Sequence, residues 1–298
     1  MVNAPLISVA LCTYNGEKFL SDQLDSIVRQ TYQNIEVVAV DDCSSDNTLL
    51  ILQEYARKYP YIKVFQNKQN KGYSKNFEHA ISLCQGEYIS ISDQDDIWVT
   101  NKLELLLGKI KTNDDLLVHS ISSKIDENGK SLQQTTFDKR SSDYNGSDPR
   151  ILTLFNIFLG HSMLFNKELA QIAFPIPPHS TYDAWLGFVA TNKKRVCVLE
   201  QVTTFFRQHN NNTSKNWEGD TKLEKIRLLQ NKIEDFLTLP DVQHRAFFEE
   251  LYQLVEKRVN GSMNIKLLLF LFKHRKVITS TFNTGTISKL NHIRKFYI

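Results

Sequence analysis

The sequence predicts a mixed α/β fold, with an open and mainly parallel sheet flanked by helices and followed by a region of helices alone. Over residues 1–112, short β-rich runs alternate with longer segments of helical period, which is typical of βα units on a parallel sheet. From residue 113 the pattern is less regular, which predicts mixed or antiparallel pairing. From residue 221 only helical patterns remain.

The individual elements follow from apolar periodicity. The predicted strands are residues 6–12, 35–41, 62–66, 88–92 and 116–125. The predicted helices are residues 17–30, 47–58, 74–84, 101–112 and 182–190. In the first helix Phe19, Leu20, Leu24 and Ile27 recur at three- and four-residue intervals, which places them on one face. The last of these helices follows a rigid proline-rich break at 175–178.

The start of the second helix carries its own signal. It is preceded by Ser44, Ser45 and Asp46, whose side chains accept the first free N–H groups of a helix. For Asp42 to Ser44, helix capping is therefore a full alternative to a functional role.

The bulk composition limits the function classes. A chain of 298 residues with 41% apolar and 11% aromatic content can build one sizeable core, alone or with a smaller appendage. Its net charge of only +3 and its lack of a Gly/Ser/Arg-rich tract predict no nucleic-acid partner.

The cysteines and the N-terminus bear on the compartment. The four cysteines include no Cys-x-x-Cys pair, which predicts buried thiols rather than zinc ligands or disulfides. No signal-peptide pattern opens the sequence, and the most apolar tract, 265–272, is shorter than the roughly 20 residues that span a bilayer. We therefore expect a cytoplasmic protein.

The C-terminal tail is strongly basic. Residues 257–298 contain no Asp or Glu, and Lys266 and Lys273 flank the apolar run 267–272. A basic amphipathic helix binds the surface of an anionic membrane, where each Lys or Arg contributes about 1 kcal/mol. Peripheral membrane contact is one interpretation of the tail. Helices that simply pack on the preceding domain are the other.

Polar residues follow three predicted strands. The first strand leads into Thr13, Tyr14 and Asn15, the second ends at 41–44, and the fourth leads into 93–96, Asp-Gln-Asp-Asp. Because parallel strands deliver their carboxyl ends to one rim, we expect these side chains to form a single site.

The carboxylates at 93–96 predict a metal. Close carboxylates repel one another by about 1 to 4 kcal/mol per pair at intermediate dielectric, and a cation relieves that repulsion. Hard oxygen ligands favour Mg²⁺ or Mn²⁺.

Four segments in order carry a resemblance to a known family. They are residues 8–15, 40–46, 70–72 with Asn76, and 92–96. Together they resemble the inverting family 2 glycosyltransferases with the GT-A fold, a Rossmann-like mixed sheet flanked by helices, over residues 6–215. The run 94–98, Gln-Asp-Asp-Ile-Trp, is similar to rhamnosyltransferase-type enzymes of bacterial surface-polysaccharide assembly.

The resemblance implies a domain organisation. Residues 1–220 would form a GT-A catalytic domain, with a nucleotide-binding half at 1–112 and an acceptor half at 113–220. Residues 221–298 would form the helical, basic C-terminal region.

The resemblance also implies donor-side roles. Asp41 would accept the N3–H of uracil or thymine, which favours a UDP- or dTDP-sugar, and Asp93 would bind the ribose. Asp95 would hold the metal that bridges the diphosphate, with His209 as a further ligand. The remaining implied nucleotide-sugar contacts are Thr13, Tyr14, Asn15, Glu17, Asp42, Lys75, Asn76, Gln94 and Arg207. A solvated helix face is the alternative for Lys75, and a polar turn is the alternative for Arg207 and His209.

Inverting transfer requires a general base on the acceptor side. Asp183, at the start of the helix after the proline-rich break, stands where the family carries its catalytic carboxylate. The subgroup often has His before that Asp, and Tyr182 stands here instead. A helix-start Asp favoured by the helix dipole is the alternative. His161 and Trp185 would contact the acceptor, with a structural histidine and a core tryptophan as the alternatives.

The expected function is sugar transfer, with rhamnose as one candidate sugar, to a saccharide or lipid-linked acceptor in surface-polysaccharide synthesis. One rival is a sugar nucleotidyltransferase. It would need a glycine-rich basic loop after the first strand, where this chain has 13–17, Thr-Tyr-Asn-Gly-Glu. The other rival is a non-catalytic subunit that binds nucleotide sugars.

Overall fold

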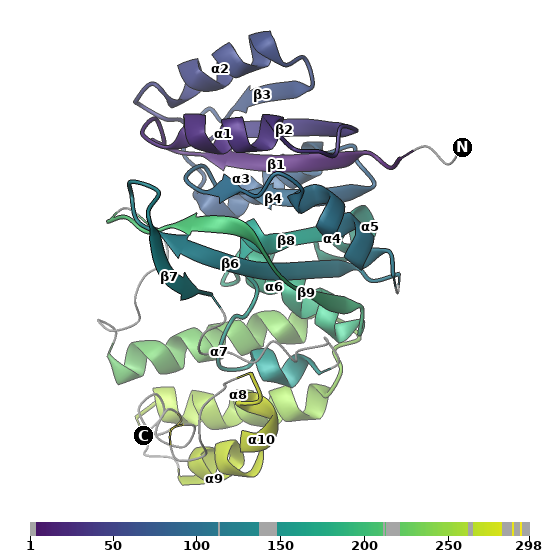
Figure 1. Cartoon of the computed structure of the whole chain (residues 1–298). Helices are drawn as coiled ribbons and strands as arrows, with labels where there is room; N and C mark the ends of the chain where they lie inside the picture. The colour runs from purple at the N-terminus through teal and green to yellow at the C-terminus, as the bar shows by residue number, and fades with distance from the viewer. Residues whose placement is uncertain are drawn as a thin grey trace.

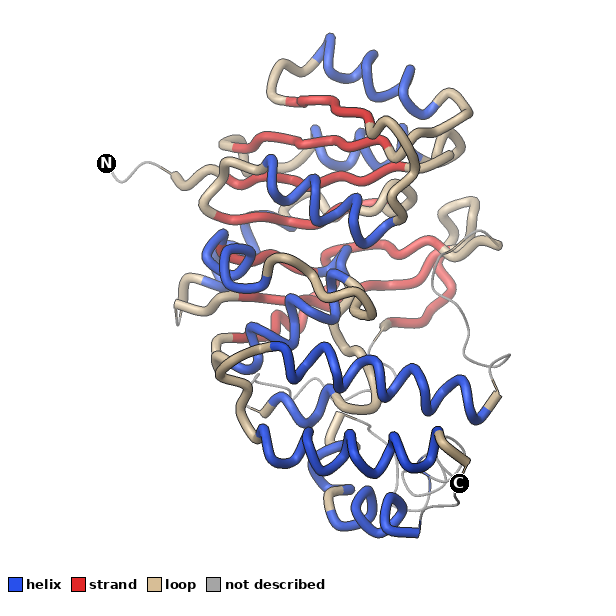
Figure 2. Tube along the Cα trace, turned by 180° about the vertical axis from the view of Figure 1, so that it is seen from behind, coloured by secondary structure: helices blue, strands red, loops and turns tan. Residues whose placement is uncertain are grey.

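A single mixed sheet runs through the molecule with helices on both faces (Figures 1 and 2). The computed structural model describes residues 4–112, 114–136, 148–210, 212, 221–261, 265–281, 288 and 293. The strands in this part are β1 (Ile7–Thr13), β2 (Ile35–Asp41), β3 (Ile62–Gln66), β4 (Tyr88–Ser92), β5 (Ile97–Trp98), β6 (Leu117–Ile125), β7 (Ser131–Thr135), β8 (Met163–Asn166) and β9 (Val196–Arg207).

The helices alternate with the strands and then continue alone, as expected. They are α1 (Leu20–Val28), α2 (Thr48–Lys58), α3 (Tyr73–Leu83), α4 (Lys102–Ile110), α5 (Lys167–Ala173), α6 (Tyr182–Asn192), α7 (Lys222–Thr238), α8 (Arg245–Val259), α9 (Ile265–Lys273) and α10 (Arg275–Ile278). Two short 3₁₀ turns lie at Pro149–Leu152 and Gly160–Ser162. Asp46, one of the three residues predicted to cap α2, accepts the N–H of Thr48 at 3.0 Å, whereas Asn47 at the N-cap position makes no side-chain cap bond.

The first half of the sheet is parallel. Strand β1 lies between β2 and β4, and β3 extends the sheet beyond β2. Every residue of β1 and β2 is buried, which explains their nearly continuous apolar sequences. The four predicted parallel strands are confirmed.

The second half mixes directions, as the irregular pattern predicted. Strand β8 is antiparallel to both β4 and β6, β6 is parallel to β9, and β7 is antiparallel to β6. The two-residue strand β5 is antiparallel to the end of β9, with Ile97 opposite Phe205. This pairing brings the end of β9 against the turn that follows β4.

The C-terminal helices share a core with the sheet. Helices α1, α2 and α4 cover one face, and α3, α5 and α6 cover the other. The hydrophobic core between the sheet and α3, α5 and α6 continues into α7 to α9. There Phe236 of α7 stacks on Phe188 of α6, with 3.6 Å between the ring centroids. The tail helices described here therefore pack on the domain. No helix in the described part of the chain is both long and apolar enough to cross a membrane.

Helix α6 packs so closely on the preceding segment that one position requires glycine. A β-carbon at Gly187 would overlap the ring of Phe158, which is buried. A β-carbon at Gly108 on α4, by contrast, would meet no neighbouring atom within 4 Å.

We expect Gly187→Ala to destabilise the protein by about 1–3 kcal/mol, because the added methyl group overpacks a dense core. Gly108→Ala is the matched control and should stabilise by about 0.5–1 kcal/mol through helix propensity. Urea unfolding of both variants measures the two effects. Equal stability of the two variants would contradict this packing.

Candidate active site

The ends of β1, β2 and β4 are tied together by side-chain hydrogen bonds. Asp41 is fully buried and accepts bonds from the Thr13 hydroxyl (3.0 Å), the Ser44 amide (3.0 Å) and Gln66 Nε2 (3.2 Å). The Ser44 hydroxyl also donates to it. Both carboxylate oxygens of Asp41 thus already have partners, and a nucleobase N–H would share one of them.

The residue after Asp41 organises the loop that leads to α3. Asp42 accepts from Asn67 Nδ2 (2.7 Å) and from the amides of Lys71 (2.9 Å) and Gly72 (2.9 Å). Asn76 is buried and donates to the Val40 carbonyl oxygen at 3.0 Å. These contacts favour a structural role for Asp42 and Asn76, which were both predicted to contact the nucleotide sugar. They also show that Asp42 does not cap α2.

Lys75, the other predicted ligand on α3, lies at the surface. Its ammonium group contacts Glu78 at 2.6 Å and the Ile176 carbonyl oxygen at 3.1 Å. The contact with Glu78 favours the solvated-face alternative.

Residues 14–17, which follow β1, are held by hydrogen bonds to the segments after β2 and β4. Gln94 accepts from the Tyr14 amide (2.8 Å) and donates to the Tyr14 carbonyl oxygen (3.1 Å), and Tyr14 is 49% exposed. Asn15 adopts a positive φ of 47° and accepts from the Ser45 amide at 2.9 Å. Glu17 accepts from the Asn47 amide at 2.9 Å.

The acidic turn at 93–96 carries three carboxylates with different exposures. Asp93 is 35% exposed at its side chain, Asp95 16%, and Asp96 0%. Asp95 Oδ2 lies 2.9 Å from His209 Nε2, so the two predicted metal ligands meet. Asp96 Oδ1 accepts the Arg207 amide at 3.1 Å. Its buried Oδ2 has no hydrogen-bond partner among the described residues.

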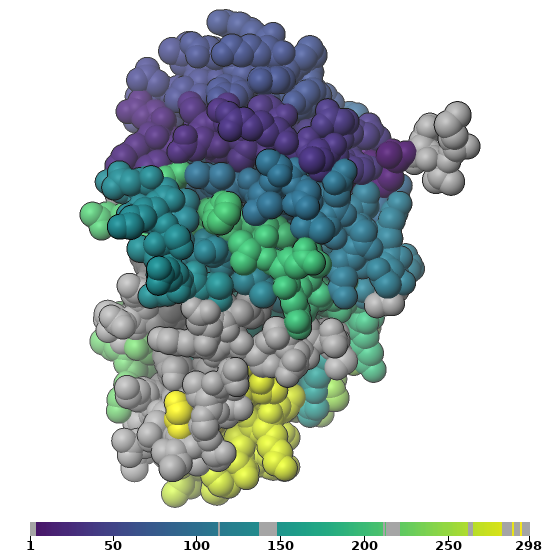
Figure 3. Space-filling model, viewed as in Figure 1, coloured from purple at the N-terminus to yellow at the C-terminus, as the bar shows by residue number. Residues whose placement is uncertain are grey.

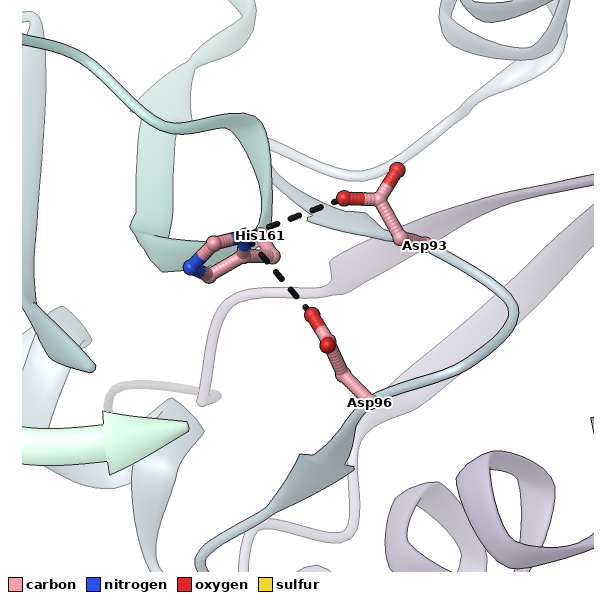
Figure 4. Close-up of side chains that lie close together, drawn as sticks. All are labelled: Asp93, Asp96 and His161. Carbon is pink, nitrogen blue, oxygen red and sulfur yellow. Dashed lines mark ion pairs between the residues drawn. The ribbon is translucent and has the colours of Figure 1, made fainter. Parts of the chain in front are cut away.

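A second group of side chains that could hold a metal ion combines two carboxylates of this turn with His161 of the 3₁₀ turn Gly160–Ser162. Figure 4 shows His161 facing Asp93 and Asp96, with Nδ1 at 3.8 Å and 3.6 Å from their Oδ2 atoms. One ligand atom from each of the three lies within 4.8 Å of the others. The sequence predicted a metal at 93–96 as a run, but it assigned Asp95 as the ligand, Asp93 to the ribose and His161 to the acceptor side.

His161 is buried, and its ring stacks on Phe206 at 4.6 Å. Its Nε2 lies 2.9 Å from the Ser122 hydroxyl. Burial lowers the pKa of His161 to about 3, so the imidazole is neutral at pH 7. This position favours the structural alternative over the predicted acceptor contact.

Burial and charge perturb the carboxylates of the turn. Burial, with the charges of Asp95 and Asp183, raises the pKa of Asp93 to about 7. Burial raises the pKa of Asp96 well above its usual range. Both shifts disfavour the ionised form of these groups in the absence of a cation.

A lysine that the sequence did not single out lies beside the turn. Lys102 is fully buried and donates to the His161 carbonyl oxygen (2.6 Å) and the Thr204 hydroxyl (2.9 Å). Its ammonium lies 3.8 Å from the centroid of the Trp98 ring. Burial lowers the pKa of Lys102 to about 7. Its position at the start of an ordinary amphipathic helix gave no signal in the sequence.

Arg207 is buried and stabilises the same turn through hydrogen bonds. Its guanidinium donates to the carbonyl oxygens of Asp95 (2.8 Å) and Glu127 (2.8 Å) and to Asp22 Oδ2 (2.9 Å). With a bond from each guanidinium nitrogen inside the protein, Arg207 is suited to holding the turn rather than to the predicted diphosphate contact.

Asp183 lies at the start of α6, far from the acidic turn in the sequence. Its Oδ1 accepts from the Thr181 hydroxyl and the Ala184 amide, and its Oδ2 accepts from Asn156 Nδ2 at 3.1 Å. Burial raises the pKa of Asp183. Its charge in turn raises the pKa of Asp93, so the structure brings the predicted base and the acidic turn together.

The predicted sugar contact of Trp185 is not supported. Its indole is 3% exposed and donates to the Ala173 carbonyl oxygen at 2.6 Å. The alternative of a core tryptophan fits this position.

Known proteins share this organisation. The sequence model of the family described as "Glycosyl transferase family 2" matches residues 8–184. An uncharacterized glycosyltransferase of Haemophilus influenzae is 27% identical over 69% of this chain and 80% of that protein. The Escherichia coli UDP-Glc:alpha-D-GlcNAc-diphosphoundecaprenol beta-1,3-glucosyltransferase is 26% identical over 79% of this chain and 88% of that protein.

A solved structure confirms the fold expectation. Staphylococcus aureus TarS 1–349 in complex with UDP-GlcNAc superposes with a TM-score of 0.64 at 19% identity, and the match covers 91% of this chain and 81% of that one. The GT-A type of mixed sheet is confirmed by this likeness, while the rhamnosyltransferase subgroup remains a prediction.

The family match spans more than half of the chain, from β1 through the acidic turn to Asp183. It sets aside the nucleotidyltransferase alternative. This chain belongs to glycosyltransferase family 2.

Proposed function

We propose that the chain is a metal-dependent, inverting transferase that moves a sugar from a UDP- or dTDP-sugar to a saccharide or lipid-linked acceptor in surface-polysaccharide synthesis. One observation carries this proposal. Asp183 lies apart from the acidic turn in sequence and on another helix, yet its charge acts on Asp93. We infer that the predicted donor-side cluster and this isolated carboxylate border one site.

The residues of the acidic turn fit a divalent cation. Asp95 with His209 offers a carboxylate oxygen and an imidazole nitrogen 2.9 Å apart, and the buried Asp96 Oδ2 has no hydrogen-bond partner among the described residues. Carboxylate ligands suit Mg²⁺ and Mn²⁺, and imidazole is an additional ligand in many transition-metal sites. A bound cation would supply positive charge to the diphosphate leaving group.

Asp183 would act as the general base. Its Oδ1 accepts two hydrogen bonds, whereas Oδ2 accepts one from Asn156 and keeps a lone pair for the acceptor hydroxyl. When Oδ2 takes the hydroxyl proton, the acceptor oxygen attacks the anomeric carbon as the nucleoside diphosphate leaves from the opposite face. A single displacement of this kind inverts the anomeric configuration.

The choice of donor and acceptor rests on the relatives. The name of the E. coli relative specifies UDP-glucose and a diphosphoundecaprenol-linked acceptor, and TarS was solved with UDP-GlcNAc. These support a uridine donor and a lipid-linked acceptor. Rhamnose is supported by the 94–98 sequence alone.

Turnover should require a divalent cation. We expect nucleoside diphosphate release from a UDP- or dTDP-sugar with Mn²⁺ or Mg²⁺ and a lipid-linked acceptor, and a drop of more than about 100-fold with EDTA, since the cation stabilises the leaving group. Re-addition of metal is the control. Full turnover in EDTA would overturn the metal assignment.

Asp183→Asn should reduce kcat by about 10²–10⁴-fold while donor affinity stays unchanged, because the amide cannot accept the proton. Asp241→Asn, at a carboxylate 57% exposed and paired with Lys193, is the matched control and should keep full activity. Calorimetric titration of UDP checks donor binding. Loss of UDP binding equal to the loss of kcat would mean that Asp183 serves the donor instead.

The pH profile should report the environment of Asp183. The base must be ionised to accept a proton, so activity falls as the solution is acidified through the pKa of Asp183. Because that pKa is raised, the fall begins at a higher pH than for an ordinary aspartate. The Thr181 hydroxyl bond lowers that pKa, so Thr181→Val should move the acidic limb of kcat/KM to higher pH. A lower kcat with an unmoved limb would show that Thr181 is merely structural.

A further inference from the structure

Helix α9 has two apolar faces. Leu267, Phe270 and Leu271 are buried, and the Phe270 ring packs at 5.1 Å from that of Phe247 on α8. On the other side Ile265 is 70% exposed, Leu269 61% and Phe272 46%. Residues spaced i, i+4 and i+7 lie on one side of a helix, so the three form a continuous exposed stripe.

Basic residues border this stripe. Lys266 and Lys273 are exposed, seven residues apart, and each follows a residue of the stripe. At about 100° per residue, both lie on the same flank of it. The guanidinium of Arg275 lies 4.2 Å from the centroid of the Phe272 ring, and Lys276 is exposed as well.

The segment that carries the stripe is basic, because residues 257–298 contain no Asp or Glu, although the charge of Glu250 on the neighbouring α8 acts on His274. A second copy of the chain is a poorer occupant than an anionic surface. A two-fold contact through the stripe would bring Lys266 and Lys273 of both copies together, and α9 itself provides no carboxylate between them. A partner with an apolar interior and an anionic surface satisfies both features.

We propose that α9 docks the protein on the surface of an anionic lipid bilayer. Ile265, Leu269 and Phe272 enter the boundary between headgroups and acyl chains, and Lys266 and Lys273 lie against anionic headgroups. The nine residues of α9 are too few to span a bilayer, so the helix lies in the plane of the interface. In Figures 1 and 3 this end of the molecule lies opposite α2 and β3. The docking surface is thus separate from the nucleotide-binding half.

The test is cosedimentation of the full chain with vesicles of phosphatidylcholine alone or with phosphatidylglycerol. We expect binding to the anionic vesicles, and weaker binding as salt screens the lysines. Replacing Ile265, Leu269 and Phe272 together by serine should lower the partition coefficient at least about tenfold. Lys266→Glu with Lys273→Glu should lower it by about fivefold or more per lysine.

The matched control is Leu50→Ser with Lys58→Glu on α2. Leu50 is 49% exposed and Lys58 is exposed, so the control makes one change of each kind at the far end of the molecule and should bind as the parent does. Circular dichroism and UDP binding show that each variant is folded. Asp183→Asn should bind vesicles normally, which separates this proposal from that of sugar transfer.

Three results would overturn the proposal. One is the absence of sedimentation with phosphatidylglycerol vesicles. Another is equal binding by the parent and the serine variant. The third is a parent dimer without vesicle binding that the serine variant converts to a monomer, which would make the stripe a contact between copies.

Discussion

The structure depends on holding several carboxylates at the end of one buried strand. Two buried basic side chains, Arg207 and Lys102, lie against this arrangement. Arg207 donates to the backbone of the turn and to Asp22, and the charge of Lys102 opposes the raised pKa values of Asp93 and Asp96. Removing one partner of a buried ionic group typically costs about 3–5 kcal/mol, because the remaining charge loses its compensation. The turn therefore requires α4 and the far end of β9 as much as the strand that precedes it.

This requirement links the two halves of the sheet to the C-terminal helices. Strand β9 delivers Arg207 from the second half of the chain to a turn in the first. Helix α6, which carries Asp183, stacks Phe188 on Phe236 of α7. Asp235 of α7 also accepts the Ser180 hydroxyl at 2.6 Å, just before α6 begins. The C-terminal helices thus help to fix the position of the proposed base and are part of the same structural unit.

The local parts of this arrangement could be predicted from the sequence, whereas the long-range parts could not. Apolar periodicity indicated β1 to β4, and the strand ends indicated where polar side chains would meet. The two residues of β5 are too few to show a period. The roles of Lys102 and Arg207 depend on partners about 60 to 185 positions away. The sequence could not decide whether Trp185 contacts a sugar or lies in the core. Its helix is mostly apolar with little periodicity, so only the tertiary packing shows which residues face the solvent.

The carboxylates of the site differ in role because they differ in surroundings. In the turn, burial and the repulsion between neighbouring carboxylates raise the pKa values of Asp93 and Asp96, so protons would compete with the proposed divalent cation for the same oxygens. Asp183 is half-buried, and although burial raises its pKa, hydrogen bonds from Thr181, Ala184 and Asn156 favour its ionised form. The three groups that donate hydrogen bonds to Asp183 are uncharged, and burial lowers the pKa of Lys232 against the charge of Asp183, so the Asp183 carboxylate keeps the basicity that the proposed role requires. Such a separation of environments lets neighbouring acids bind charge and accept a proton at the same pH.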